Sequence, residues 1–148
     1  MSEEHVPPSN GLSGLYIVSL VNEQPIGVNA NDPRRAATCL RVNRLNCKFG
    51  KAKNLATRRK NYDAVFGAHN VRFHPIVAMD DAAQGERTVL VDLRAFRVRH
   101  SNGRMHEWLV GITPEQLEGI VLQALSRAQM TFRRIRSVVD ADASARER

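Results

Sequence analysis

Cysteine is scarce in this sequence: of 148 residues only Cys39 and Cys47 are cysteines, and they form no CxxC pair. Neither a zinc cluster nor a disulfide framework is therefore supported, and two reduced thiols are expected. Long apolar runs are also missing, since none reaches the ~18 residues of a membrane span. The first residues are acidic and contain proline, unlike a signal peptide. We expect a cytoplasmic protein that does not enter a membrane.

Acidic residues are in the minority, because 15 Asp and Glu stand against 22 Lys and Arg, which gives a formal net charge of +7. A cationic protein attracts polyanions over about a Debye length, so DNA is an expected partner and RNA a possible one. Apolar residues (43%) and charged residues (25%) are close to globular averages, which argues against wholesale disorder. The length suits one domain with its own core.

Local composition divides the chain into a leader, one domain and a tail. Residues 1–13 contain two adjacent prolines and few apolar side chains, and we expect them to be a mobile leader. Residues 14–138 are expected to form the folded domain. Residues 139–148 are expected to be a mobile tail.

Three segments have the β-branched and aromatic composition of strands. The first covers residues 14–21, and the second covers 38–49, with an irregularity near Asn43. These two are expected to pair. The third covers 71–79, where Pro75 predicts a sheet edge or a bulge because it cannot donate a ladder hydrogen bond. The letters DDAAQG that follow are expected to break this strand.

Capping residues and apolar spacing predict two helices. Asn54 is a good N-cap for a helix that ends at Gly67. Thr113 opens the capping-box sequence TPEQ, and the final helix that follows is expected to extend to about Val138. The segment 86–96 fits a helix face as well as a strand, and its apolar spacing leaves both open.

Basic residues are concentrated between Arg34 and Lys60, a region without any acidic residue. Lys and Arg side chains and helix N-terminal N–H groups are common contacts to a nucleic-acid backbone. We expect a phosphate-binding surface here, and the alternative is a solvated face without a binding function. The residues expected to bind nucleic acid are Arg34, Arg35, Lys51, Lys53, Arg59 and Lys60.

Several short motifs occur in an order that resembles one known family. The motif GLY at 14–16 opens the first strand, KFG at 48–50 closes the second, and Arg58 follows the last glycine of KFG by eight residues. This set resembles the GIY-YIG nuclease superfamily, and in particular its phage-type branch, in which the second motif reads Lys-Ile-Gly. The stretch GRMHEWL at 103–109 also resembles a Gly-Arg-x-x-Glu-Trp stretch of that branch.

The resemblance implies a metal-dependent DNA endonuclease, from a phage or mobile element, that hydrolyses phosphodiester bonds. It implies that Tyr16 takes the proton from the attacking water, with Lys48 as the cation that lowers the tyrosine pKa from about 10. Arg58 would neutralise the phosphate, and Tyr62, one turn further, would hydrogen-bond the phosphate or a catalytic partner. Glu86 would hold one Mg²⁺ or Mn²⁺ ion through a single carboxylate.

The resemblance also implies a fold, and it leaves other functions open. It assigns residues 86–96 to a helix, and it implies an α/β (α+β) fold in which an antiparallel sheet of about three strands is flanked by helices. The long insert at 22–37 and Lys48 in place of a second tyrosine depart from the family pattern, and they bear on activity more than on fold. Two other functions stay open: a catalytically inactive nucleic-acid-binding module of the same fold, and an interaction domain that binds RNA or ribosomes.

Overall fold

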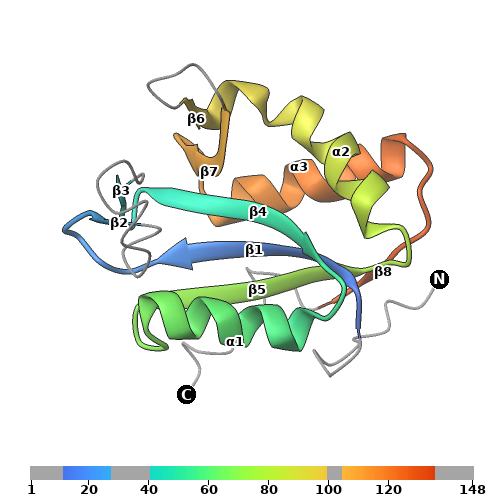
Figure 1. Cartoon of the computed structure of the whole chain (residues 1–148). Helices are drawn as coiled ribbons and strands as arrows, with labels where there is room; N and C mark the ends of the chain where they lie inside the picture. The colour runs from blue at the N-terminus through green and yellow to red at the C-terminus, as the bar shows by residue number, and fades with distance from the viewer. Residues whose placement is uncertain (1–11, 28–40, 100–104, 136–148) are drawn as a thin grey trace, which may run out of the picture.

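The structure is a computed structural model that describes residues 12–27, 41–99 and 105–135. Within them, three helices flank a six-stranded sheet in which each strand runs antiparallel to its neighbours (Figure 1). None of these helices is long and apolar enough to cross a membrane. The helices are α1 (Leu55–Phe66), α2 (Ala82–Asp92) and α3 (Pro114–Arg127), and a 3-10 turn covers Arg94–Phe96.

The six strands lie in the order β6-β7-β4-β1-β5-β8. A separate small sheet pairs β2 (Ile26–Gly27) with β3 (Arg41–Val42). The strands of the large sheet are β1 (Gly14–Leu20), β4 (Asn46–Ala52), β5 (Val71–Ala78), β6 (Arg97–Arg99), β7 (Met105–Val110) and β8 (Arg133–Arg134). The α/β class and the pairing of the first two predicted strands are confirmed. The expected size of about three strands is wrong, because β6 and β7 extend the sheet beyond β4 and β8 extends it beyond β5.

The interior of β5 contains the irregularity that its proline predicts. The register of β1 against β5 shifts between Leu15 and Tyr16, so that Leu15 faces Val77 while Tyr16 faces Pro75. Ile76 is therefore the extra residue of a bulge. A bulge accommodates proline because one ladder hydrogen bond is already interrupted there.

Two element boundaries differ from the expectation. The final helix ends at Arg127 instead of about Val138, because Gln129 adopts a positive φ of 57° and turns the chain back toward the sheet. The Ile135 amide then donates to the Ile76 carbonyl, and the Ile135 side chain is buried. The helix α2 begins at Ala82, within the segment expected to break the strand, since the Asp81 side chain caps it.

The second predicted strand is divided into two. It forms β3 and β4, separated by a turn at Arg44 and Leu45, and the turn confirms the irregularity expected near Asn43. The Asn43 side chain accepts a hydrogen bond from the Leu45 amide, as asparagine does in tight turns. The remaining part of that prediction, 38–40, lies outside the described residues.

Alternation along β1 gives the sheet two buried faces. Leu15 and Ile17 belong to a core that is covered by α2 and α3, which we call the α2/α3 face. Tyr16 and Val18 belong to a second core that is covered by α1, which we call the α1 face. Figure 1 shows α1 on one side of β1, β4 and β5, with α2 and α3 on the other. Residues on neighbouring positions of a strand therefore contribute to different sites.

Candidate active site

Tyr16 lies in an aromatic cluster on the α1 face. Its ring stacks on Phe73 with ring centroids 4.8 Å apart and meets the edge of Tyr62 at 5.6 Å. The hydroxyl oxygens of Tyr16 and Tyr62 lie 3.0 Å apart and share a hydrogen bond. Gly50 faces Tyr16 in the strand register, and a Cβ at Gly50 would lie 2.6 Å from the tyrosine Oη. The glycine of the second motif is thus needed because the Tyr16 ring covers it.

Two cations border this tyrosine pair. The Lys48 ammonium lies 5.1 Å from the centroid of the Tyr62 ring, and Lys48 faces Val18, which places it on the α1 face. The Arg58 side chain is exposed on α1. Both cations act to lower the pKa of Tyr16, but burial of a side chain that is only 2% exposed, together with Tyr62, outweighs them. The pKa of Tyr16 is therefore raised, opposite to the direction that a proton acceptor needs.

The structure distinguishes the two adjacent arginines of α1. Arg58 is close enough to Tyr16 to influence the tyrosine pKa, and it lines a cleft at the start of α1. Arg59 is also exposed but is not among the residues that line this cleft. Of these two arginines, Arg58 is therefore the one that borders the cleft, and its role in phosphate binding stays a prediction.

Glu86 lies on the other face of the sheet. It extends from α2, and its Oε1 atom is 3.9 Å from the Nζ atom of Lys51. Lys51 follows Gly50 on β4 and faces Leu15, which belongs to the α2/α3 face. The structure thus gathers Tyr16, Lys48, Arg58 and Tyr62 on the α1 face, and it pairs Glu86 with Lys51 on the opposite face.

The cleft is lined by one member of each group, Arg58 and Lys51, whereas the other members are not among its lining residues. It has a volume of about 490 Å³ and lies where β4 leads into α1 and where β5 leads into α2. Arg58 enters from the α1 side, and Lys51 enters from the strand beside Glu86. The other lining residues are Ser13, Ala52, Lys53, Asn54, Thr57, Asn61, Asp80, Asp81, Ala82 and Ala83.

The cleft contains residues that the sequence interpretation did not select. Asp80 and Asp81 line it, although their segment was expected only to end a strand. The sequence feature that could have indicated them is a pair of adjacent carboxylates between the end of a strand and the start of a helix. Of the predicted nucleic-acid-binding residues, Lys51 and Lys53 line the cleft, while Arg59 and Lys60 are exposed on α1. The last two, Arg34 and Arg35, lie outside the described residues.

The carboxylate of Glu86 provides the oxygen ligands that a hard divalent cation prefers. Its side chain is 18% exposed, so its carboxylate is reachable from solvent. Within the described part of the chain, no three His, Cys, Asp or Glu side chains gather into a metal-binding group. Mg²⁺ is often bound through one or two carboxylates with water completing its shell, so a single carboxylate fits this ion.

Comparison of the chain with family models, with curated proteins and with solved structures gives no match.

Proposed function

We propose that this protein is a metal-dependent DNA endonuclease of the GIY-YIG type that hydrolyses phosphodiester bonds at the cleft. One observation carries the proposal: Arg58 and Lys51 line the same cleft, and Lys51 contacts Glu86, the carboxylate suited to Mg²⁺. Phosphodiester hydrolysis needs positive charge on the phosphate and an activated water. The cleft offers the positive charge through Arg58 and Lys51, and Glu86, which contacts Lys51 but is not a lining residue, would hold the metal ion that activates the water.

The cleft residues have distinct roles in this proposal. Arg58, Lys51 and Lys53 attract and neutralise the phosphate, because all three are exposed cations that line the cleft. Glu86 would hold Mg²⁺ or Mn²⁺. When bound, such an ion stabilises charge on the phosphate and lowers the pKa of a water ligand.

The tyrosine pair has a hydrogen-bonding role in this proposal. The raised pKa of Tyr16 keeps its phenol neutral, and its hydroxyl is already bonded to that of Tyr62. We therefore assign both tyrosines to positioning groups beside Arg58, in place of the proton-acceptor role that the resemblance implies for Tyr16.

A second candidate is a nucleic-acid-binding module of the same fold that does not cut. The burial of Tyr16 favours it, since only 2% of this residue is exposed. The position of Lys51 also favours it, because an ammonium group beside Glu86 competes with a metal ion for the carboxylate. The basic cleft would then bind phosphate without hydrolysis.

Nicking of a supercoiled plasmid separates the two candidates. The full chain is incubated with plasmid and Mg²⁺, Mn²⁺ or EDTA, and DNA binding is measured in parallel by gel shift. Glu86→Gln keeps the size of the side chain but removes the charge that a hard cation requires. Glu115→Gln, at an exposed position in the first turn of α3, is the matched control.

We expect nicking with metal, no nicking with EDTA or in Glu86→Gln, and normal nicking in Glu115→Gln. DNA binding of Glu86→Gln should survive or tighten, because a negative charge near the phosphate is lost. Nicking retained by Glu86→Gln would refute the metal role. Binding without nicking by the parent protein would establish the second candidate.

A further inference from the structure

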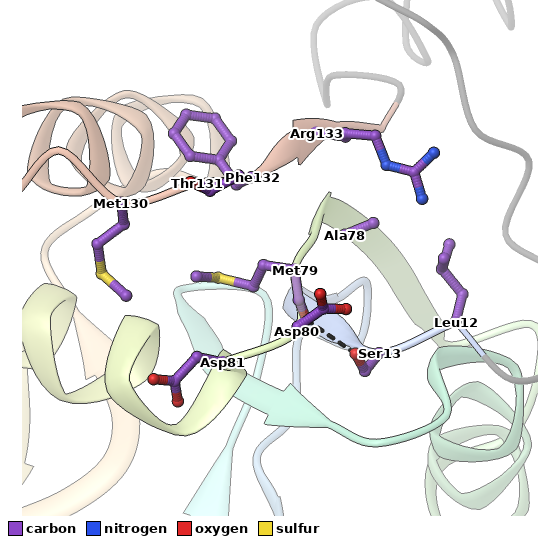
Figure 2. A pocket seen from close by; sticks show the side chains of 10 residues that line it. All are labelled: Leu12, Ser13, Ala78, Met79, Asp80, Asp81, Met130, Thr131, Phe132 and Arg133. Atoms are coloured by element: carbon purple, nitrogen blue, oxygen red, sulfur yellow. Dashed lines mark hydrogen bonds between the residues drawn. The ribbon is translucent and has the colours of Figure 1, made fainter.

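A second pocket lies beside the cleft, separated from it by the turn that contains Asp80 and Asp81. Its volume is about 540 Å³. Ser13, Asp80 and Asp81 line both the pocket and the cleft, so the two share a wall. The remaining walls come from the end of β5 and from the segment that joins α3 to β8 (Figure 2).

The walls of this pocket are apolar and polar in about equal parts, and the apolar part includes two methionines and a phenylalanine. Met79 is 6% exposed, and Met130 and Phe132 are half-buried and pack against the same core. Figure 2 shows the side chains of Met79 and Met130 extending toward each other, with Leu12 and Ala78 on the opposite side. Thioethers and an aromatic ring form surfaces that suit a flat heterocycle. Contact of a base with an aromatic side chain typically tightens binding by roughly 5-fold or more.

Two opposite charges border the apolar walls. Asp80 and Arg133 are both exposed and line the pocket, and no described residue forms a hydrogen bond or ion pair with either side chain. The Asp81 carboxylate is different, because it accepts a hydrogen bond from the Gln84 amide and caps α2. The Ser13 hydroxyl donates to the Met79 carbonyl. Asp80 is thus the carboxylate that is available to a ligand, and Arg133 is the available cation.

We propose that this pocket binds a nucleobase that carries an exocyclic amino group. The ring would lie among Met79, Met130 and Phe132, and its amino group would donate to the Asp80 carboxylate. Aspartate and glutamate read the amino group of cytosine in this way. A carbonyl at the same place cannot donate a hydrogen bond to the carboxylate, because both groups are acceptors. Binding of uracil and thymine is therefore disfavoured. Arg133 would attract the phosphate of the same nucleotide.

The shared wall relates this pocket to the cleft. If the cleft holds the phosphate that is cut, the pocket holds a base of a nucleotide near that phosphate; this step rests on the proposed function. A base inside a duplex is stacked and paired, so it reaches such a pocket only when it is unpaired or flipped out. The substrate class is therefore single-stranded or distorted DNA with adenine, cytosine or guanine near the scissile phosphate.

Mononucleotides test the pocket without any need for cleavage. The full chain, labelled with ¹⁵N, is titrated by NMR with cytidine and uridine monophosphates, and then with adenosine and inosine monophosphates. Within each pair, the first nucleotide has an amino group on the base at the position where the second has a carbonyl. We expect the amino-bearing member to bind at least about tenfold more tightly, the size of a hydrogen bond to a charged group. The shifted amides should include those of Met79, Asp80 and Met130.

Three variants assign the selectivity to this pocket. Asp80→Asn should reduce the preference to about twofold or less, because an amide accepts from one group and donates to the other. Phe132→Leu keeps an apolar side chain but removes the aromatic face, and it should weaken all four nucleotides by roughly 5-fold or more. Glu23→Gln, an exposed change beyond the opposite end of β1, should have no effect. Thermal unfolding of each variant controls for folding.

The outcomes separate this proposal from the nuclease proposal. Equal binding of the paired nucleotides, no binding, or a preference that survives Asp80→Asn would overturn the base pocket even if the protein nicks plasmid. A preference that depends on Asp80, in a protein that does not nick plasmid, would support the pocket and refute the nuclease.

Discussion

Substitution of Gly50 by alanine is expected to destabilise the fold through Tyr16. The new Cβ would lie 2.6 Å from the Tyr16 Oη and 2.8 Å from its Cζ, both far below van der Waals contact. The ring has no room to retreat, because it is 2% exposed and stacked on Phe73. Overpacking of this kind costs about 1–3 kcal/mol. Alanine in a strand recovers roughly 0.5–1 kcal/mol of backbone entropy, so a net loss of about 1 kcal/mol is expected.

Urea denaturation measures this loss, and the buried Trp108, the only tryptophan, provides the fluorescence signal. Gly119→Ala is the matched control, because Gly119 is exposed in α3 and a Cβ there would meet nothing within 4 Å. This control should stabilise the protein by about 0.5–1 kcal/mol. The loss caused by Gly50→Ala should shrink in a Tyr16→Leu background, where the ring is absent. Unchanged stability of Gly50→Ala in the parent would refute the close approach of the ring.

Two buried titratable groups and the basic cleft can be tested in solution. Burial raises the pKa of Tyr16 above its unfolded value of about 10, so the stability that the neutral phenol contributes is complete below pH 10 and is lost as the pH rises. Between pH 9 and pH 11, a Tyr16→Phe variant should therefore lose less free energy of unfolding than the parent, by on the order of 1 kcal/mol in urea titrations. Burial also raises the pKa of Cys47 to about 12, so in a Cys39→Ser background iodoacetamide at pH 8 should label Cys47 no faster than the protein unfolds, and rapid labelling would contradict its burial. Combined Lys51→Ala and Lys53→Ala substitution should reduce the salt slope of DNA binding by roughly 2, as measured by gel shift, and an unchanged slope would place the phosphates elsewhere.

The parts of the fold that the sequence predicts are those with strong local signals. Asn54 and Thr113 cap α1 and α3 through their side chains, as the sequence indicates. Pro75 lies at a bulge for the physical reason that predicted one. The two edge strands were missed because RVR in β6 and RR in β8 are too short to establish an alternating pattern. Their pairing depends on long-range contacts, for example between the Ile135 amide and the Ile76 carbonyl.

The sequence selects some of the residues that line the cleft, and their functional roles stay predictions. The motif spacing selected Arg58 over Arg59, and only Arg58 of the two lines the cleft. The sequence does not reveal that Glu86 lies on the face opposite Tyr16, because strand alternation and helix packing decide this in three dimensions. Nor does it reveal the direction of the Tyr16 pKa shift, since burial by several distant elements outweighs two nearby cations. Asp80 was missed because two carboxylates in a turn have no specific spacing.

The most direct test of the central claim compares plasmid cleavage by Arg58→Ala and Arg59→Ala. Arg58 lines the cleft, so in the proposed function its loss would remove charge from the phosphate, whereas Arg59 is exposed on the same helix and is not a lining residue. Neither change removes buried apolar area, so both variants should fold. Removal of a group that stabilises the developing charge typically costs about 10²–10³ in rate. We predict that loss for Arg58→Ala and a rate within a few-fold of the parent for Arg59→Ala; equal rates for the two variants, or a greater loss for Arg59→Ala, would contradict the account.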